Sequence, residues 1–406
     1  MYFVISTFGC KVNQYESSGL SELMRQNGFK PADSAERASV HIINSCTVTE
    51  NGDRKVKQLI KRVKKKNPNA VVVLCGCFPK AFPEKAALTG ADVIVPGTPS
   101  DSVSVQSERT RAFLKIEDGC ERECAYCIIP KARGAVKSRP IRDIAAEAET
   151  LAANGHKEIV LTGVNLCAYG GGDGRSLSEA VGAVCGVGGI ERVRLSSLEP
   201  DLISESDIAR LAEFPKLCPH FHLSLQSGSD AVLRRMKRRY DADYYEKTAK
   251  SLREAFPECA LTTDIIAGFP GETEAEFAET LAFAEEMRFV KIHAFAYSRR
   301  EGTAAADMPR QISNAVKRER VAKLLALSDR LRGDFFKEQT GKERAVLIEK
   351  SAKTGETGSG GCFCRSYGRA PDYTPVKIAG EFRRNEIVTV KITGFEGEYC
   401  LGETIC

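Results

Sequence analysis

The chain has 406 residues, of which 42% are hydrophobic and 28% are charged, as in ordinary globular proteins. A single hydrophobic core rarely extends beyond roughly 250–300 residues, so this length excludes one compact core and predicts two or three domains. The formal net charge of +5 is small for such a chain. Composition alone therefore does not indicate a nucleic-acid partner, and local clusters have to carry that argument.

Export and membrane insertion are not expected. The first ten residues, MYFVISTFGC, are apolar but lack a basic leader and a small-residue cleavage site, so they predict a β-strand rather than a signal peptide. No apolar run approaches the roughly 20 residues that cross a bilayer, which predicts a soluble, cytoplasmic protein with no membrane partner. Fifteen cysteines in such a chain argue against a disulfide scaffold, because reducing conditions leave thiols available to metals.

The first part of the chain alternates short β-branched segments with helical ones, which predicts a small parallel α/β sheet. The expected strands are Tyr2–Thr7, Val40–Asn44, Val71–Cys75 and Val93–Val95, and the helices include Glu16–Asn27 and Arg54–Lys66. The Ser- and Pro-rich segment PSDSVSVQSERT (99–110) is typical of an exposed connection. We expect the first domain to comprise residues 1–104.

The same alternation resumes at Arg111, and six further strands separated by helices predict a partial (β/α) barrel in residues 105–337. These strands are expected at Ala112–Glu117, Glu158–Thr162, Arg192–Ser196, Phe221–Leu225, Leu261–Ile266 and Lys291–Tyr297. Active sites of such barrels lie at the C-terminal ends of the strands.

Residues 338–406 have a different sequence pattern, in which short predicted strands are separated by Gly-rich turns such as GETGSGG. This pattern predicts a small β-barrel module with strands at Ala345–Glu349, Val376–Ile378 and Ile387–Thr393. The fold class is therefore α/β, with a C-terminal β-barrel.

The most specific chemical signal is Cys120-x-x-x-Cys124-x-x-Cys127, directly after the first strand of the expected barrel. Three thiolates from one tight loop can bind three irons of a cubane cluster and leave the fourth iron open for a substrate. The alternative is a zinc knuckle completed by a distant fourth residue. The position of the triad at the start of a barrel favours the cluster.

A second group consists of Cys10, Cys46 and Cys77, each at the end of an expected strand. Strand ends of an open α/β sheet converge on one crevice, so these thiols can bind a second cluster with its own open iron. The alternative is that each packs as a small buried hydrophobe. Cys75 competes for the third position, but Cys77 follows Gly76 at the loop and is the preferred ligand.

The triad, with an aromatic residue before its last cysteine, resembles the radical-SAM superfamily. That resemblance implies that the open iron chelates S-adenosylmethionine, whose reductive cleavage yields a 5′-deoxyadenosyl radical. The resemblance extends along the whole chain to the methylthiotransferases, which join an auxiliary-cluster domain, a radical-SAM barrel and a TRAM β-barrel. It is carried by Gly9-Cys10-Lys11-x-Asn13, Asn44-Ser45-Cys46-Thr47, Gly76-Cys77 and the triad with CIIPKARG.

Five segments resemble the branch that acts on N6-threonylcarbamoyladenosine at position 37 of tRNA: LTGVNLCAYG, RLSSLEP, HLSLQSGSDAVLRRMKRRY, TTDIIAGFPGE and AYSRREGT. The sequence departs from the family pattern at Phe78-Pro79-Lys80 and at Lys131, which leaves details of the auxiliary pocket open. The resemblance implies two 4Fe–4S clusters, one of which generates the radical while the other carries a sulfur already methylated by a first S-adenosylmethionine. It also implies a reducing protein such as flavodoxin or ferredoxin, and a sulfur donor.

Three alternatives remain open at this point. The same chemistry can act on isopentenyladenosine in tRNA or on an aspartate of a ribosomal protein. A protein of another class, a non-catalytic iron–sulfur RNA-binding protein, would use the clusters as structural or redox-sensing groups.

The resemblance to radical-SAM barrels implies a S-adenosylmethionine pocket lined by Asn165, Glu199, Gln226 and Asp264, each near the end of an expected strand. Ribose hydroxyls and an ammonium group need such acceptors. Helix capping in a βα loop is the alternative use of Glu199 and Asp264.

RNA contacts are expected at a basic run and in the C-terminal module. The run comprises Arg234, Arg235, Lys237, Arg238 and Arg239, which can neutralise phosphates or simply form a solvated face. In the module, the resemblance to TRAM domains points to Arg365, Arg369, Arg383 and Arg384. The remaining thiols, Cys362, Cys364, Cys400 and Cys406, are interpreted as incidental.

Overall fold

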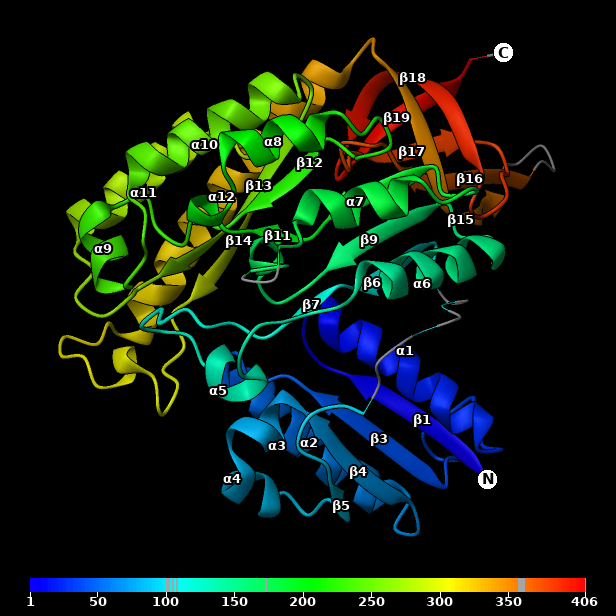
Figure 1. Ribbon diagram of the computed structural model, residues 1–406, viewed down its shortest axis with the longest axis vertical. Helices are drawn as coiled ribbons and strands as arrows, with labels where there is room; N and C mark the ends of the chain where they lie inside the picture. The colour runs from blue at the N-terminus through cyan, green and yellow to red at the C-terminus, as the bar shows by residue number, and fades with distance from the viewer. Residues whose placement is uncertain (100–102, 104–105, 107–108, 172–173, 357–361, 406) are drawn as a thin grey trace.

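The computed structural model describes the chain except residues 100–102, 104–105, 107–108, 172–173, 357–361 and 406. Its strands form three groups along the chain, shown in blue, green to yellow, and orange to red in Figure 1. The expected α/β fold with a C-terminal β-barrel is confirmed. Among the described residues, no helix is both long and apolar enough to cross a membrane.

The N-terminal group is a parallel five-stranded sheet in the order β2-β1-β3-β4-β5. Its strands are β1 (Tyr2–Thr7), β2 (Lys30–Pro31), β3 (Val40–Ser45), β4 (Val71–Gly76) and β5 (Val93–Ile94). The helices are α1 (Lys11–Gln26), α2 (Glu50–Lys66), α3 (Cys77–Ala81) and α4 (Pro83–Ala87). β3 and β4 are in register at Asn44 and Cys75, so the cysteines that follow them leave the sheet at the same edge.

Helix α1 begins at Lys11 rather than at Glu16, where the sequence pattern placed its start. Asn13, Tyr15 and Glu16 are all buried, so polar side chains in the first turn face the interior and hide the helical periodicity. The consequence is that Cys10 occupies the N-cap position of α1.

The central group consists of two parallel sheets, β10-β9-β6 and β11-β12-β13-β14, with β6 and β14 as edge strands. The strands are β6 (Arg111–Lys115), β9 (Glu158–Thr162), β10 (Arg192–Leu195), β11 (Ser197–Leu198), β12 (His220–Leu223), β13 (Ala260–Ala267) and β14 (Lys291–Ala296). A short hairpin, β7 (Glu117–Asp118) with β8 (Lys137–Ser138), lies between β6 and β9 in the chain. All six expected barrel strands are present.

Helices cover the outside of this barrel: α6 (Ile141–Ala153), α7 (Leu177–Cys185), α8 (Glu205–Ala212), α9 (Asp230–Arg235), α10 (Ala242–Ala255), α11 (Glu274–Glu286) and α12 (Asn314–Gln339). The short helix α5 (Ile129–Arg133) instead lies between the barrel and the N-terminal domain, where Ala132 joins the N-terminal core. Short 3-10 turns occur at Leu166–Ala168, Pro200–Leu202 and Ala304–Ala306. The largest apolar core lies between these helices and the strands. Helix α12 continues to Gln339, past the domain boundary expected after residue 337.

The C-terminal group is a closed barrel in the order β15-β16-β17-β19-β18. Its strands are β15 (Glu343–Glu356), β16 (Cys362–Arg369), β17 (Pro375–Ala379), β18 (Ile387–Glu396) and β19 (Tyr399–Thr404). The sequence pattern missed β16 and β19, because glycines and charged residues interrupt their alternation. Figure 1 shows this module against the N-terminal ends of the barrel strands, on the side opposite to their arrowheads.

Candidate active site at two groups of cysteines

Cys10, Cys46 and Cys77 lie at the ends of three adjacent parallel strands. Cys10 follows β1 as the N-cap of α1, Cys46 comes directly after β3, and Cys77 begins α3 directly after β4. Burial is the main cause that raises the pKa of Cys77 to about 12; the neighbouring thiols of Cys46 and Cys10 raise it further, and Arg133 opposes them. The structure thus brings the three predicted thiols together.

Two glycines make this convergence possible. Gly9 and Gly76 precede Cys10 and Cys77 and have φ angles of +120° and +93°, a region that favours glycine. A Cβ atom on Gly9 would lie 2.8 Å from the Cβ of Cys46. The close approach of the two cysteine loops therefore depends on the missing side chain.

Cys75 does not share this position. Its thiol donates to the carbonyl of Ile43 over 3.7 Å and packs in a buried cluster with Leu20 and Ile42. The neighbouring thiol of Cys77 is instead reached by a guanidinium group from the barrel. The choice of Cys77 over Cys75 as the third ligand stays a prediction, and the structure separates the environments of the two thiols.

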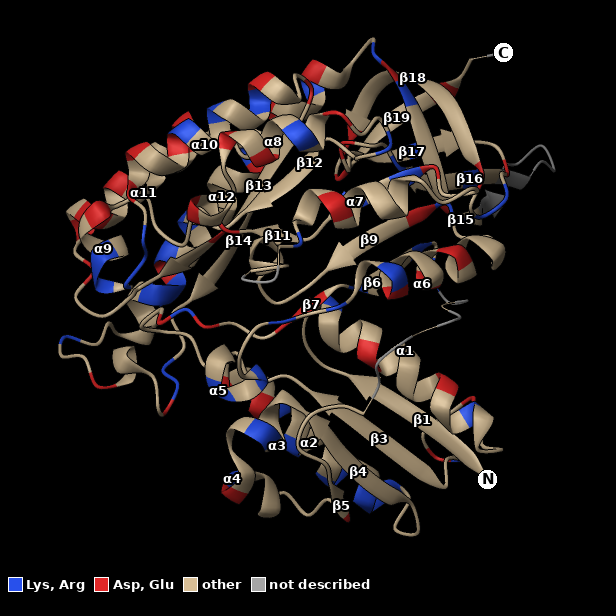
Figure 2. Ribbon diagram, in the orientation of Figure 1, with Lys and Arg blue, Asp and Glu red and all other residues tan. Residues whose placement is uncertain are grey.

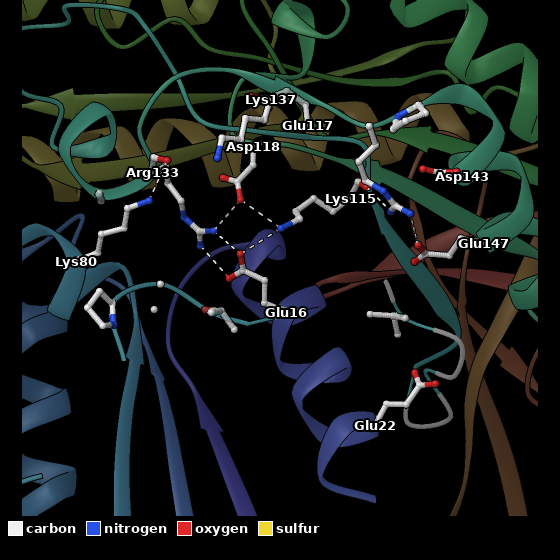
Figure 3. A pocket seen from close by; sticks show the side chains of 18 of the residues that line it. Glu16, Glu22, Lys80, Lys115, Glu117, Asp118, Arg133, Lys137, Asp143 and Glu147 are labelled. Atoms are coloured by element: carbon white, nitrogen blue, oxygen red, sulfur yellow. Dashed lines mark hydrogen bonds and ion pairs between the residues drawn. The ribbon is translucent and has the colours of Figure 1, made fainter. Parts of the chain in front are cut away.

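That guanidinium belongs to Arg133, at the end of α5, and it joins the two domains. Its Nε donates to the Sγ of Cys77 over 3.1 Å, and its Nη2 donates to Asn13 over 3.3 Å and to Glu16 over 3.1 Å. Its Nη1 pairs with Glu16 and lies 3.2 Å from Asp118. Figure 3 shows the side chains of Arg133, Glu16 and Asp118 pointing toward one another in a cavity of about 830 Å³ between the domains.

The second group of thiols lies in the loop between β7 and α5. The loop is held by backbone hydrogen bonds from Cys120 to Gly134 and from Cys127 to Cys124, each 2.9 Å long. Arg238 donates its Nη1 to the Sγ of Cys124 over 3.1 Å. Burial, the largest cause, raises the pKa of Cys127 to about 12, so its thiol needs a metal or a cation to deprotonate near neutral pH.

Asn165 and Glu117 present unpartnered acceptors next to this loop. The amide nitrogen of the Asn165 side chain is 3.9 Å from the Sγ of Cys120, and its backbone N–H donates to Glu117 over 2.8 Å. Within the described residues, Asn165 Oδ1 and Glu117 Oε1 are buried without a hydrogen-bond partner. Burial raises the pKa of Glu117 to about 8. Orphaned buried acceptors of this kind indicate that a ligand with donors binds beside the loop.

Glu199 also reaches this site, through an ion pair with Arg238, the residue that contacts Cys124. Asp264 does not: its carboxylate pairs with His222 over 3.3 Å inside the barrel. The backbone of Gln226 has a φ angle of +68° and hydrogen-bonds to β13 on both sides, and its side chain is buried. Of the four residues expected around S-adenosylmethionine, Asn165 and Glu199 are therefore the two that lie by the cysteine loop.

The helix-capping alternative fails for both acidic residues. Glu199 occupies the N-cap of the short turn at Pro200–Leu202, but in the described structure its side chain makes no capping hydrogen bond. Asp264 lies inside strand β13 and is not at a helix start.

The basic run divides into two kinds of residue. Arg235 forms a two-pronged ion pair with Glu276, with both N–O distances at 2.8 Å, and Arg238 is buried at the cysteine loop. Arg234, Lys237 and Arg239 are exposed. Figure 2 shows basic segments on α9, at the end of the barrel toward which the strands point. The RNA-binding expectation is best kept for these three side chains.

In the C-terminal module, Arg365 is exposed, whereas Arg369 is half-buried. The guanidinium of Arg369 lies 4.5 Å from the ring centre of Tyr373, and its Nη1 donates to the Tyr373 carbonyl over 3.2 Å. Arg369 thus faces the barrel rather than solvent.

The donor sets have the chemistry that iron–sulfur clusters require, because each group presents three free cysteine thiols. Among the described residues, no group of three His, Cys, Asp or Glu side chains is close enough to hold a single metal ion. A cubane cluster requires a wider spacing of the thiols than a single metal ion does. Each thiolate binds a different iron, so the thiols must lie apart by the width of the cluster. All six thiols are free of disulfide bonds.

Sequence reasoning missed Arg133 and Glu117, and it assigned Arg238 to RNA. Glu117 carried a usable signal, since an acidic residue at the end of the first barrel strand precedes the cysteine loop. The contacts of the two arginines with thiols join elements far apart in the sequence, so no local pattern reveals them.

Two family models match the chain. Residues 114–284 match the radical SAM superfamily, and residues 2–95 match an uncharacterized protein family, UPF0004. Among solved structures, a radical S-adenosylmethionine methyltransferase, TsrM, of Kitasatospora setae covers 75% of each chain with a TM-score of 0.54 at 14% identity. That likeness shows the fold alone.

Curated relatives match over nearly the full length. Threonylcarbamoyladenosine tRNA methylthiotransferase MtaB of Bacillus subtilis is 37% identical over 95% of this chain and 92% of its own. The protein of the same name from Thermotoga maritima is 38% identical over 85% of this chain and 86% of its own. A tRNA-2-methylthio-N6-dimethylallyladenosine synthase of Clostridium perfringens is 35% identical over 99% and 97%. The chain belongs to the radical-SAM methylthiotransferase family.

Proposed function

We propose that this enzyme converts N6-threonylcarbamoyladenosine at position 37 of tRNA, next to the anticodon, into its 2-methylthio derivative in the cytoplasm. The observation that carries the proposal is the match to the Bacillus subtilis enzyme over 95% of this chain and 92% of that one. The dimethylallyladenosine synthase is almost as similar, so the choice of base needs its own test. Methylthiolation of isopentenyladenosine or of a ribosomal-protein aspartate is the alternative with the same chemistry.

Bound in this chain, two 4Fe–4S clusters and S-adenosylmethionine supply a carbon-centred radical, a sulfur atom and a methyl group. Cys120, Cys124 and Cys127 are the thiols for one cluster. Arg238 places a positive charge and an N–H donor on Cys124, which favours its thiolate form. The free acceptors of Asn165 and Glu117 can bind the ammonium and hydroxyl groups of S-adenosylmethionine.

Cys10, Cys46 and Cys77 are the thiols for the auxiliary cluster. Arg133 acts on Cys77 as Arg238 acts on Cys124, because its N–H donor and charge favour the thiolate. Its second function is to hold the N-terminal sheet against the barrel through Glu16. The two groups of thiols are thereby kept in one site.

Two further partners belong to the proposal. Reductive cleavage of S-adenosylmethionine consumes an electron, which a small reducing protein such as flavodoxin or ferredoxin supplies. The sulfur that is inserted into the base comes from a separate sulfur donor.

Two cysteine variants test the division of labour in anaerobically reconstituted enzyme. Cys124→Ala is expected to abolish formation of 5′-deoxyadenosine. Cys46→Ala is expected to keep S-adenosylmethionine cleavage and to lose the methylthio product. Normal product from Cys46→Ala would overturn the two-cluster scheme.

Mass spectrometry of tRNA nucleosides from a deletion strain tests the substrate. Loss of the 2-methylthio form of threonylcarbamoyladenosine alone is expected. Loss of the isopentenyl derivative, or of a modified ribosomal-protein aspartate, would reassign the target. A non-catalytic RNA-binding protein would instead bind tRNA anaerobically with no turnover of S-adenosylmethionine.

A further inference from the structure

A second cavity lies inside the barrel, away from the domain interface. Its volume is about 390 Å³, and it is lined by residues of both edge strands, β6 and β14, and of β10 and β12. Tyr373 and its neighbours in the C-terminal module also line it. Lys11, the neighbour of the predicted cluster ligand Cys10, also lines it. One lining residue of the cavity therefore directly follows Cys10 in the chain.

Positive charge predominates in this cavity. Six Lys or Arg side chains line it, against two acidic ones, Asp372 and Glu398. Three of the arginines, Arg111, Arg194 and Arg369, lie 4.5 to 4.8 Å from the ring centre of Tyr373. Their charges are partly balanced by carboxylates behind the wall, such as the fully buried Glu158, 2.7 Å from Arg194.

Lys11 and Lys291 add positive charge, and both line the cavity. Within the described residues, no carboxylate lies within ion-pair distance of either lysine. Asp264 offsets part of the charge of Lys11, because the lysine, after His222, helps to hold the pKa of that buried carboxyl below its usual value against the effect of burial. Burial lowers the pKa of His220, and the charges of Arg194 and Lys11 lower it further, so these groups lie close to one another. An anion in the cavity would meet the lysine and the arginine together.

Several buried polar atoms in the wall lack partners, and one of them, Arg194 Nη2, can only donate. Across the described part of the chain, Arg194 Nη2, Ser196 Oγ and His220 Nδ1 have no hydrogen-bond partner. The side chain of Arg194 is only 3% exposed, and its other nitrogens are bound to Glu158 and to the carbonyl of Pro371. Buried polar groups without partners are rare in folded proteins and need an explanation. A bound carboxylate would satisfy donors of this type.

We propose that this cavity binds the free carboxylate of the threonylcarbamoyl group of the substrate base, with Lys11 and Arg194 as the cations that select it. The inference rests on the proposed function. A threonylcarbamoyl substituent carries a carboxylate and a hydroxyl, whereas a dimethylallyl substituent is apolar and would leave these charges and donors unpaired. The cavity thus discriminates between the two substituents that the names of the relatives distinguish.

The test uses reconstituted holoenzyme and anticodon stem-loops that carry threonylcarbamoyladenosine either as the free acid or as its neutral methyl ester. The measured quantity is the ratio of kcat/KM for acid over ester, which cancels any damage to the clusters. Wild type is expected to prefer the acid by about 10- to 100-fold. In Lys11→Met the ratio is expected to fall toward one, and in Lys11→Arg to stay high. Lys61→Met, an exposed lysine on α2, is the matched control and keeps the wild-type ratio.

Binding supplies a second readout, since anisotropy of the labelled stem-loops under anaerobic conditions gives Kd without turnover. The acid is expected to lose affinity in Lys11→Met, and the ester to lose little. The inference would be overturned if Lys11→Met kept the full preference for the acid. If the wild-type enzyme still modified the acid in that case, the proposed function would stand. A wild-type enzyme that modifies only isopentenyladenosine stem-loops would overturn the proposed function itself.

Discussion

Replacing Arg133 with Met tests whether the contact between the domains also holds the auxiliary thiols. The side chains of Arg133 and Glu16 are 8% and 2% exposed, so the ion pair between them is buried. Removing one partner of a buried pair costs about 3–5 kcal/mol, because a buried charge is left behind. Lys115, 3.4 Å from Glu16, still compensates part of that charge, so we expect the lower end, about 3 kcal/mol.

The loss is expected to be local, because the broken contacts join α1 and α3 to the barrel. Hydrogen exchange of reconstituted protein should show faster exchange in α1 with little change in α10, on the far side of the barrel. The midpoint potential of the auxiliary cluster, followed by electron paramagnetic resonance, should become more negative, because a positive charge and an N–H donor to Cys77 are removed.

Two controls isolate the effect. Lys247→Met removes an exposed cation from α10, away from the contact between the domains, and should leave both exchange and potential unchanged. Arg133→Lys keeps the charge but cannot reach Cys77, Asn13 and Glu16 together, so an intermediate result is expected. Unchanged exchange in α1 together with an unchanged potential in Arg133→Met would refute the reasoning.

Three other predictions follow from single contacts. Burial raises the pKa of Glu117, so the folded state resists ionisation of this carboxyl and stability falls as pH rises from about 4.5 to about 8. In urea denaturation, Glu117→Gln should remove this loss of stability, which amounts to at most ~5 kcal/mol over that pH range. In metal-free protein, iodoacetamide should label the exposed Cys10 well before the buried Cys77, and equal labelling rates by mass spectrometry would contradict the burial. Arg239→Ala should reduce the slope of the logarithm of the tRNA binding constant against the logarithm of salt concentration by about one phosphate contact. Arg235 forms its ion pair within the protein, so Arg235→Ala should lower thermal stability and leave this salt slope unchanged.

The sequence predicts best what depends on local periodicity. Barrel strands such as Glu158–Thr162 have the predicted bounds, because parallel strands buried on both faces read as continuous β-branched runs. The signal of Cys120, Cys124 and Cys127 is equally local, since the spacing of the three residues alone predicts three ligands. The convergence of Cys10, Cys46 and Cys77 is harder to predict from the sequence. It requires the order of the strands in the sheet as well as the residues at which the strands end.

Contacts between distant elements escape the sequence for a physical reason. Arg238 stands in a run of basic residues, and its periodicity does not distinguish it from its exposed neighbours Lys237 and Arg239. Only the path of the chain after α9 turns its side chain inward, onto Cys124 and Glu199. Lys11 is likewise an ordinary first-turn residue until the docking of α1 places it in the barrel cavity.

The two groups of thiols share one arrangement that neither group reveals by itself. In each, a guanidinium nitrogen lies 3.1 Å from one cysteine sulfur, Arg133 on Cys77 and Arg238 on Cys124, and a carboxylate, Glu16 or Glu199, pairs with the same guanidinium. The carboxylate holds the guanidinium group in place and balances its charge. The N–H donor to the cysteine sulfur is therefore oriented before any cluster binds.

The arrangements differ in where their parts come from. Arg238 and Cys124 both belong to the barrel, whereas Arg133 comes from the barrel and Cys77 from the N-terminal sheet. The auxiliary site is therefore complete only when the two domains are docked. The docking contact and the thiol contact use the same guanidinium, so loosening the domains also removes the hydrogen bond to sulfur. If the proposed division of labour holds, the chemistry at Cys77 therefore depends on how the N-terminal sheet docks onto the barrel.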